Sequence, residues 1–323
     1  YEANGMAEEA MALYEDIYTN IVPTRPEAYR NMIRLLQAQD RDPEAAVLMQ
    51  LAYEKTELTT FRNMRNELLP QSPVADLTAG LYSMKKELAA LLGRDRLLKS
   101  AVKEVNKQDM IKASMVIRNA HHEEIDIEKI LGGDLQKDLA LGDYVYIENF
   151  TRLVKVADNC LDMGNYIDKH FLISAYRTLA DDPDGYFRKT NPVVYTFNHV
   201  PAHALDIEEK LDDAMRRVYR PEAGNNVVLK AMYIHNKLID IYPFPDFNAE
   251  IAVFALNYYL MENGFTPINM PVKRDQYCTM VADCLKGKNQ EVFYNFLVRA
   301  VYDKMEGTID ACMEYLKNNQ PAE

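Results

Sequence analysis

The chain has 323 residues, of which 48% are hydrophobic and 27% are charged, so it holds enough apolar material for a sizeable core. Its 49 acidic and 37 basic residues give a formal net charge of −12, which argues against nucleic acid and anionic membranes as general partners. The longest apolar run, from Ile251 to Met261, falls short of the ~20 residues that a membrane span needs.

The cysteines indicate a reducing compartment, so a cytoplasmic location is expected. They have neither CxxC spacing nor the density of a disulfide scaffold, and buried free thiols are the favoured interpretation. The four are Cys160, Cys278, Cys284 and Cys312. No signal-peptide pattern stands at Tyr1, and a leader removed upstream of it stays an open alternative.

The N-terminal third is predicted to consist of helices separated by proline breaks. The expected helices cover residues 7–18, 27–39, 43–69, 77–92 and 97–112. We place the domain boundary after residue 108, with an N-terminal helical region at 1–108 and a helical core at 109–323. The first region is either a platform packed on the core or a separate partner-binding module.

The middle of the chain carries its one strand signal. Helical periodicity runs over residues 144–180, and Asp181 to Gly185 then break the chain. The segments 185–188, 193–195 and 199–201 are expected to form a small β-hairpin. If the edge of that hairpin is open, a target segment could add to it as a strand. A further helix is expected over 205–219.

Two helices that meet at a proline-rich loop organise the core. Apolar residues recur at helical spacing from Val227 to Ile241, and Pro243 and Pro245 then forbid the helix from continuing. The next helix, over 249–263, is apolar nearly all round, which is typical of a central, buried helix. His235 lies in the first of them, as His170 lies in another apolar helix, and both are expected to be satisfied core histidines. Two closing helices are expected within 274–318.

The loop between these helices is poorly suited to phosphate. A helix N-terminus attracts anions because its first N–H groups lack partners. A phosphate-binding loop needs glycine where the backbone approaches closely, but Phe247 and Ala249 hold the candidate positions. Glu250 adds a carboxylate in the first turn, and two like charges about 4 Å apart repel by roughly 1–4 kcal/mol.

The loop and its flanks resemble the Fic (Fido-fold) family, whose motif reads His-x-Phe-x-Asp/Glu-Gly-Asn-Gly-Arg-x-x-Arg. Three of the eight specified positions match: Phe244, Asp246 and Asn248. Tyr242 stands at the position of the catalytic His, Phe247 and Ala249 at the glycines, and Glu250 and Val253 at the arginines. The resemblance implies an all-α helical bundle with a small β-hairpin flap.

Flanking segments extend this resemblance over roughly residues 109–305. The turn at 263–268 looks like the one after the central helix of the family. The segment 185–201 is similar to the flap that receives the target, and its candidate residues are Arg188, Val193, Val194, Tyr195 and His199.

In active members the motif His takes a proton from a target hydroxyl, the acidic residue holds Mg²⁺, and the Gly-Asn-Gly-Arg segment grips the phosphates of ATP. Here Tyr242, with an ordinary pKa near ~10, is a poor base at neutral pH. Both glycines and both arginines are replaced, which removes most of the positioning and charge stabilisation that nucleotidyl transfer needs. The resemblance therefore indicates a catalytically impaired member.

A second stretch resembles the regulatory helix of many Fic proteins, which carries Ser/Thr-x-x-x-Glu-Gly/Asn. Ser114 and Asn119 match that pattern, and Arg118 stands where the Glu belongs. Because the core has lost its arginines and gained Glu250, we hypothesise that Arg118 pairs with Glu250 or Asp246 and closes the old nucleotide pocket. The alternative is an ordinary solvated arginine.

Two hypotheses on function follow from different classes. The first is a regulatory or protein-binding pseudoenzyme of the signalling type, with a protein partner at the flap groove and no cofactor. The second is a divergent nucleotidyl or phosphoryl transferase of AMPylating ancestry, which would use ATP with Mg²⁺ on Asp246 to modify a protein hydroxyl.

Overall fold

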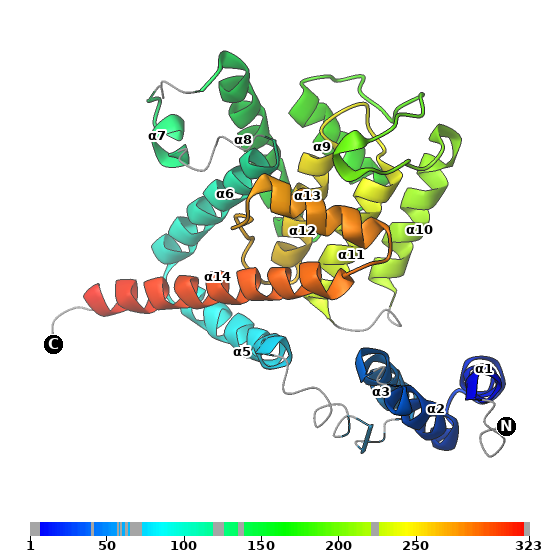
Figure 1. The fold of residues 1–323 in the computed structure, drawn as a ribbon. Helices are drawn as coiled ribbons and strands as arrows, with labels where there is room; N and C mark the ends of the chain where they lie inside the picture. The colour runs from blue at the N-terminus through cyan, green and yellow to red at the C-terminus, as the bar shows by residue number, and fades with distance from the viewer. Residues whose placement is uncertain are drawn as a thin grey trace. The chain divides into compact units, whose positions relative to one another are not determined.

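The computed structural model describes residues 7–39, 42–56, 58, 60–61, 64, 73–118, 126–134, 139–220 and 226–319. The chain forms two compact units, Tyr1–Asp76 and Leu77–Glu323 (Figure 1). The boundary predicted after residue 108 falls instead inside a helix that is continuous from Arg96 to Arg118. That helix buries Leu98 as well as Met110 and Ile111, so its two halves belong to one unit.

The first unit is a group of helices around a small core. Its elements are α1 (Ala7–Asp16), the π-helical turn η2 (Ile17–Ile21), α2 (Pro26–Ala38) and α3 (Asp42–Thr56). Pro26 stands at the first turn of α2, where a missing N–H costs nothing. The ring of Tyr29 lies fully buried against Tyr18 and Phe61. The helix expected over 43–69 ends at Thr56, and most of residues 57–72 lie outside the described residues.

The second unit is a helical bundle, and the expected all-α architecture is confirmed. Its first helices are α5 (Pro73–Leu92), α6 (Arg96–Arg118), α7 (Ile127–Leu131), α8 (Leu141–Asp162) and α9 (Lys169–Ala180). They are followed by the short η3 (Tyr195–Phe197) and η4 (Ala204–Asp206), α10 (Ile207–Tyr219), α11 (Val227–Ile241), α12 (Asn248–Glu262), α13 (Arg274–Leu285) and α14 (Gln290–Asn318).

Helix α12 is the centre of this bundle, as its apolar composition predicts. Every residue from Ile251 to Leu260 is buried, and the helix packs on α11, α6, α8 and α9 (Figure 1). The ring of Phe254 stacks on Phe171 with centroids 5.9 Å apart. The Asn257 amide is satisfied by the backbone of Ile268, so this buried polar side chain fixes the turn that follows the helix.

The cysteines carry free thiols, as expected, with Cys284 and Cys312 buried and the other two partly buried. In the described parts of the chain, no helix is both long and apolar enough to cross a bilayer.

Candidate functional site

The loop that joins α11 to α12 is bounded by two residues with left-handed backbone. Tyr242 ends α11 with φ of +52°, and its N–H donates to the Leu238 carbonyl at 2.8 Å. Phe247 precedes α12 with φ of +55°. A side chain at such a position costs roughly 1–2 kcal/mol that glycine would not incur. The loop therefore keeps a backbone that favours glycine at position 247, while Ala249 lies in the first helical turn.

The Asn248 side chain closes this loop on itself. Its Oδ1 accepts from the Phe244 N–H at 2.8 Å, and its Nδ2 donates to the carbonyls of Phe244 at 2.8 Å and Asp246 at 3.2 Å. The side chain is buried and uses both ends of its amide within the loop. An incoming group could bind Asn248 only by breaking these bonds.

Phe244 and Arg188 fix the loop to its surroundings. The Phe244 ring is fully buried and stacks on Tyr176 with centroids 4.6 Å apart and an interplanar angle of 6°. The Arg188 N–H donates to the Pro243 carbonyl, and its guanidinium donates to the carbonyls of Ile241 at 3.1 Å and Tyr242 at 2.6 Å. The end of α11 is thus capped by an arginine from the flap.

Phe247 and Tyr146 make an aromatic wall beside the first turn of α12. Their rings stack with centroids 6.0 Å apart and an interplanar angle of 28°. The Arg118 guanidinium, from the end of α6, lies 4.4 Å from the centroid of the Tyr146 ring and 5.8 Å from that of Phe247. Its Nε pairs with an Asp143 carboxylate oxygen at 3.6 Å. Three elements therefore meet at this point: α6, α8 and the loop before α12.

Arg118 reaches the loop, as hypothesised, but its ion pair is with Asp143 on α8 and not with Glu250 or Asp246. Asp143 projects from the first turn of α8 toward the end of α6, which brings it to the guanidinium first. The Arg118 charge still lowers the pKa of the Glu250 carboxyl. Of the other regulatory candidates, Ser114 is buried and bonds the Tyr146 hydroxyl, whereas Asn119 lies outside the described residues.

Glu250 places an acidic side chain in the first turn of α12. Burial raises the pKa of its carboxyl, and Asp246 raises it further, while Arg118 and Arg274 act in the opposite direction. Burial and the Glu250 charge both raise the pKa values of three tyrosine hydroxyls. They are Tyr146, Tyr242 and Tyr277. The raised pKa of Tyr242 makes that phenol a still poorer base at neutral pH.

The flap is an irregular loop, so the predicted β-hairpin is wrong. Its strand-like pairing is the single antiparallel bridge between Val194 and His199, around the 3₁₀ turn η3. Pro192 and Pro201 lack an N–H on either side of that bridge, and the ladder cannot extend. Arg188 holds the segment by donating to the Ala202 carbonyl.

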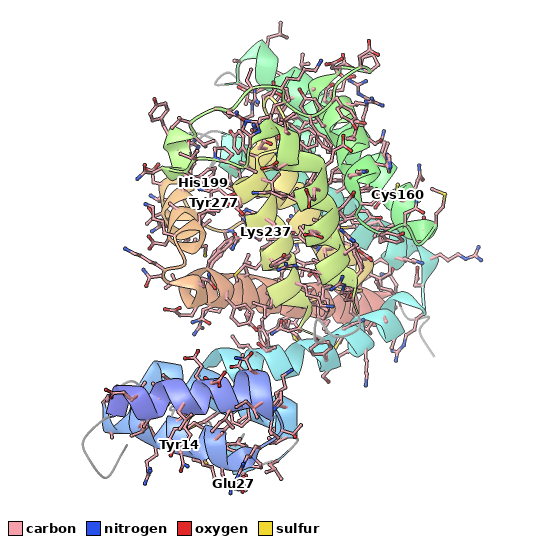
Figure 2. All side chains as sticks on the ribbon, turned by 90° about the vertical axis from the view of Figure 1, so that its right-hand side faces the viewer. Tyr14, Glu27, Cys160, His199, Lys237 and Tyr277 are labelled. Carbon is pink, nitrogen blue, oxygen red and sulfur yellow. The ribbon has the colours of Figure 1, made fainter. Side chains whose placement is uncertain are left out.

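His199 of the flap contacts α11. Its Nε2 lies 3.3 Å from an Asp240 carboxylate oxygen, and Lys237 pairs with the same carboxylate at 2.9 Å. Figure 2 shows His199, Lys237 and Tyr277 on this side of the bundle. Tyr195, on the turn, is 88% exposed. The flap thus presents Tyr195 outward while His199 and Arg188 hold it down.

Below the loop, His235 is a satisfied core histidine, as predicted. It is fully buried, with Nε2 2.8 Å from the Tyr277 hydroxyl and Nδ1 2.9 Å from Asn236 Oδ1. Burial lowers its pKa to about 4. His170, in contrast, is exposed in the first turn of α9, so the core prediction for it is wrong.

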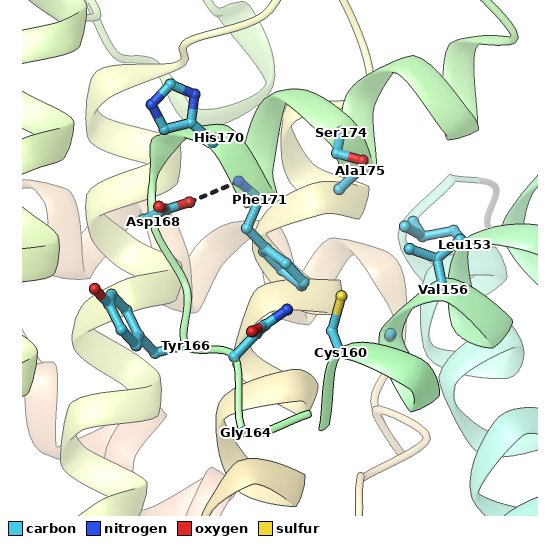
Figure 3. A pocket seen from close by; sticks show the side chains of 12 residues that line it. Leu153, Val156, Cys160, Gly164, Tyr166, Asp168, His170, Phe171, Ser174 and Ala175 are labelled. Carbon is cyan, nitrogen blue, oxygen red and sulfur yellow. Dashed lines mark hydrogen bonds between the residues drawn. The ribbon is translucent and has the colours of Figure 1, made fainter. Parts of the chain in front are cut away.

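A cavity of about 390 Å³ between α8 and α9 was not foreseen from the sequence. Cys160 and Ser174 line it with the ring of Phe171, and Asp168 caps α9 by accepting from the Phe171 N–H at 2.7 Å (Figure 3). Its residues come from two helices and the loop between them, and no motif in the sequence predicts it.

Comparison with known proteins identifies the fold. The Fic/DOC family model matches residues 166–260, which span α9, the flap, α11 and most of α12. Residues 166–260 therefore form a Fic/DOC-like region within an all-α Fido fold. Fic-1 of C. elegans is similar at 18% identity and a TM-score of 0.56, over 98% of this chain and 96% of that one.

Two bacterial structures are similar to a shorter part of this chain. A Fic domain containing signaling protein from Bacteroides thetaiotaomicron has 15% identity and a TM-score of 0.59, over 74% of this chain and 97% of that one. A Fic family protein from Desulfovibrio desulfuricans has 14% identity and a TM-score of 0.53, over 78% and 77%.

ATP and Mg²⁺, which the resemblance implies for active members, do not fit the residues of this Fic domain. The Asn248 amide is already used within its own loop, and Glu250 would stand against a phosphate at the helix N-terminus. Asp246 is exposed and lies by Tyr176. Burial and the Asp246 carboxylate together raise the pKa of Tyr176 to about 12. Among the described residues, no group of three or more His, Cys, Asp or Glu side chains is placed to hold a metal ion.

The sequence missed some of the residues that build this site. Tyr146 and Asp143 lie on α8, and Arg274 begins α13 and donates from Nε to the Ile117 carbonyl at 3.0 Å. Tyr146 was foreseen only as part of a helical periodicity. Its polar contacts, with Arg118 and the Ser114 hydroxyl of α6, depend on how α6 packs against α8.

Proposed function

We propose that this Fic-domain protein is a regulatory or protein-binding pseudoenzyme that has lost AMP transfer. The observation that carries the proposal is the state of the α12 N-terminus: Asn248 is bonded within its own loop, and the Glu250 carboxylate stands in the first helical turn. An anion site needs free N–H donors and positive potential there. At this helix terminus the Asn248 amide is already bonded. The nearby cations Arg118 and Arg274 are opposed by the Glu250 carboxylate.

The exposed side chains of the flap support a protein partner on that surface. Val193, Tyr195, Val200 and Leu205 are large apolar side chains that are 55% to 88% exposed. Scattered exposed apolar residues need no explanation, but four within thirteen residues of this segment are a concentration that a protein partner would account for. Arg188 anchors the same segment beneath them, so these side chains sit on a fixed backbone.

Calorimetric titration with ATP and Mg²⁺ tests the proposal. We expect no heat of binding for the wild type up to millimolar nucleotide. Binding tighter than about 100 µM would correspond to more than about 5 kcal/mol of free energy and would contradict it. Asp246→Ala is the matched variant, because its carboxylate is exposed and its loss leaves the Asn248 bonds in place.

The exposed position of Asp246 is what favours the alternative. A divergent transferase that modifies a protein hydroxyl would place its metal on this carboxylate. In that case the titration would show binding that Asp246→Ala abolishes, together with a requirement for Mg²⁺. Binding that persists in Asp246→Ala, or without Mg²⁺, would count against the transferase as well.

A further inference from the structure

Arg118 lies in a slot built from side chains of two other elements, α8 and the loop before α12. The Tyr146 ring forms its floor, 4.4 Å from the guanidinium carbon, and the stacked Phe247 ring forms one wall. Asp143 lies at the rim, 3.6 Å from Nε. The arginine side chain is 31% exposed, so the slot opens to solvent at that rim. A planar cation lying on an aromatic face with a carboxylate at its edge is the arrangement that guanidinium groups favour.

The charges around the slot also favour a cation. Asp143 faces it from α8, Glu250 from the first turn of α12, and Asp246 lies near Glu250 in the preceding loop. Arg274, from α13, is the opposing charge, and its Nε is bonded to the Ile117 carbonyl. Apart from Arg118 itself, the two acids Asp143 and Glu250 therefore stand against the one base Arg274. A phosphate would meet net repulsion here, whereas a cation would meet attraction.

We infer that this slot is a binding site for an alkylguanidinium group, such as the arginine side chain of a protein partner, and that Arg118 is its resident occupant. The inference deepens the proposed function and rests on it, because it assigns a ligand of opposite charge to a pocket that no longer accepts nucleotide. Arg118 is the last residue of α6, so the slot is emptied when that terminus moves away from the rings.

The test is chemical rescue with methylguanidinium in the Arg118→Ala variant. A small ligand of five heavy atoms with good efficiency binds with a Kd of about 1 mM. At about 10 mM ligand the folding equilibrium constant of the variant should then rise about tenfold, seen as a higher thermal midpoint. The wild type should respond less than about twofold, because its slot is filled. This concentration is about two orders of magnitude below that at which guanidinium denatures proteins.

Two controls separate site binding from general effects. Methylammonium at the same concentration carries the same charge without the planar fork and should not rescue. Arg152→Ala removes another arginine of the same bundle, one that pairs with Asp181 at 3.2 Å on the surface, and should not respond to methylguanidinium. Should Arg118→Ala fail to fold alone, refolding in methylguanidinium but not in methylammonium gives the same answer.

A response of Arg118→Ala no larger than that of Arg152→Ala, or equal rescue by methylammonium, overturns the inference. Titration of the wild type with ATP and Mg²⁺ tests the proposed function separately from this inference. If Arg118→Ala does not respond to methylguanidinium and the wild type does not bind ATP, only the guanidinium site is refuted. If the wild type binds ATP, the pseudoenzyme proposal is refuted.

Discussion

Replacing Arg188 by alanine should destabilise the second unit more than any other single substitution in the flap. The guanidinium is buried and donates to the carbonyls of Ile241, Tyr242, Thr190 and Ala202. Three of these bonds join segments that are far apart in the chain. Each hydrogen bond from a charged group contributes about 1.5–3 kcal/mol, and each carbonyl left unpaired costs about 1–3 kcal/mol.

Two effects reduce this sum. The bonds are not additive, and the buried guanidinium is itself costly to desolvate, since burial lowers its pKa. We therefore take about 3 kcal/mol as the loss, which for a unit of this size lowers the thermal midpoint by about 6–12 °C. Arg188→Lys keeps the charge without the fork and should lose about 2 kcal/mol.

Urea unfolding followed by circular dichroism measures the difference. Arg177→Ala is the matched control, because Arg177 is exposed on α9 and donates one bond, from Nε to the Gly185 carbonyl at 2.9 Å. We expect it to cost less than about 1 kcal/mol. An Arg188→Ala variant as stable as Arg177→Ala would refute the view that Arg188 holds the flap on the end of α11.

Three further predictions concern the backbone and two buried titratable groups. At position 247, Gly should be more stable than Ala by about 1 kcal/mol in urea unfolding, because φ is +55° there; equal stability would contradict the strain. His235 binds its proton only below about pH 4 in the folded state, while its unfolded pKa is about 6.5, so the unfolded chain takes up protons first and stability falls as pH falls below 6.5. Its share of the loss between pH 7 and pH 5 is about 2 kcal/mol, and His235→Gln should flatten that part of the stability profile; an unchanged slope would exclude it as the cause. The contribution of Glu250 to stability changes with pH in the opposite direction, because its raised folded pKa means that ionisation costs stability as pH rises. Glu250→Gln should therefore stabilise the protein at pH 7 and make no difference at pH 4. The exposed Glu306→Gln is the control.

The helices of the core could be predicted from the sequence because periodicity and proline carry their signal. The all-round apolar pattern of residues 251–261 led directly to the buried α12, and Pro243 and Pro245 led to the loop before it. The boundary after residue 108 failed for a related reason. Leu98 and Met110 lie on one continuous helix, and nothing local in the sequence says that both ends of a long helix pack in the same unit.

The site was predictable in its chain-local part alone. Phe247 at a position that favours glycine and Glu250 in the first helical turn follow from neighbours in the chain. The partner of Arg118 does not, because Asp143 comes from a helix that begins 23 residues later and competes with two carboxylates that were equally plausible. The hairpin prediction failed because Pro192 and Pro201 flank the bridge between Val194 and His199, and without their N–H groups the ladder cannot extend.

The central claim is that the N-terminus of α12 no longer accepts a nucleotide, and amide hydrogen exchange of Asn248 through Ile251 tests it most directly. We predict the same exchange rates with and without about 5 mM ATP and Mg²⁺, because no phosphate reaches these amides. Slower exchange of these amides in the presence of nucleotide, reversed in Asp246→Ala, would contradict the account.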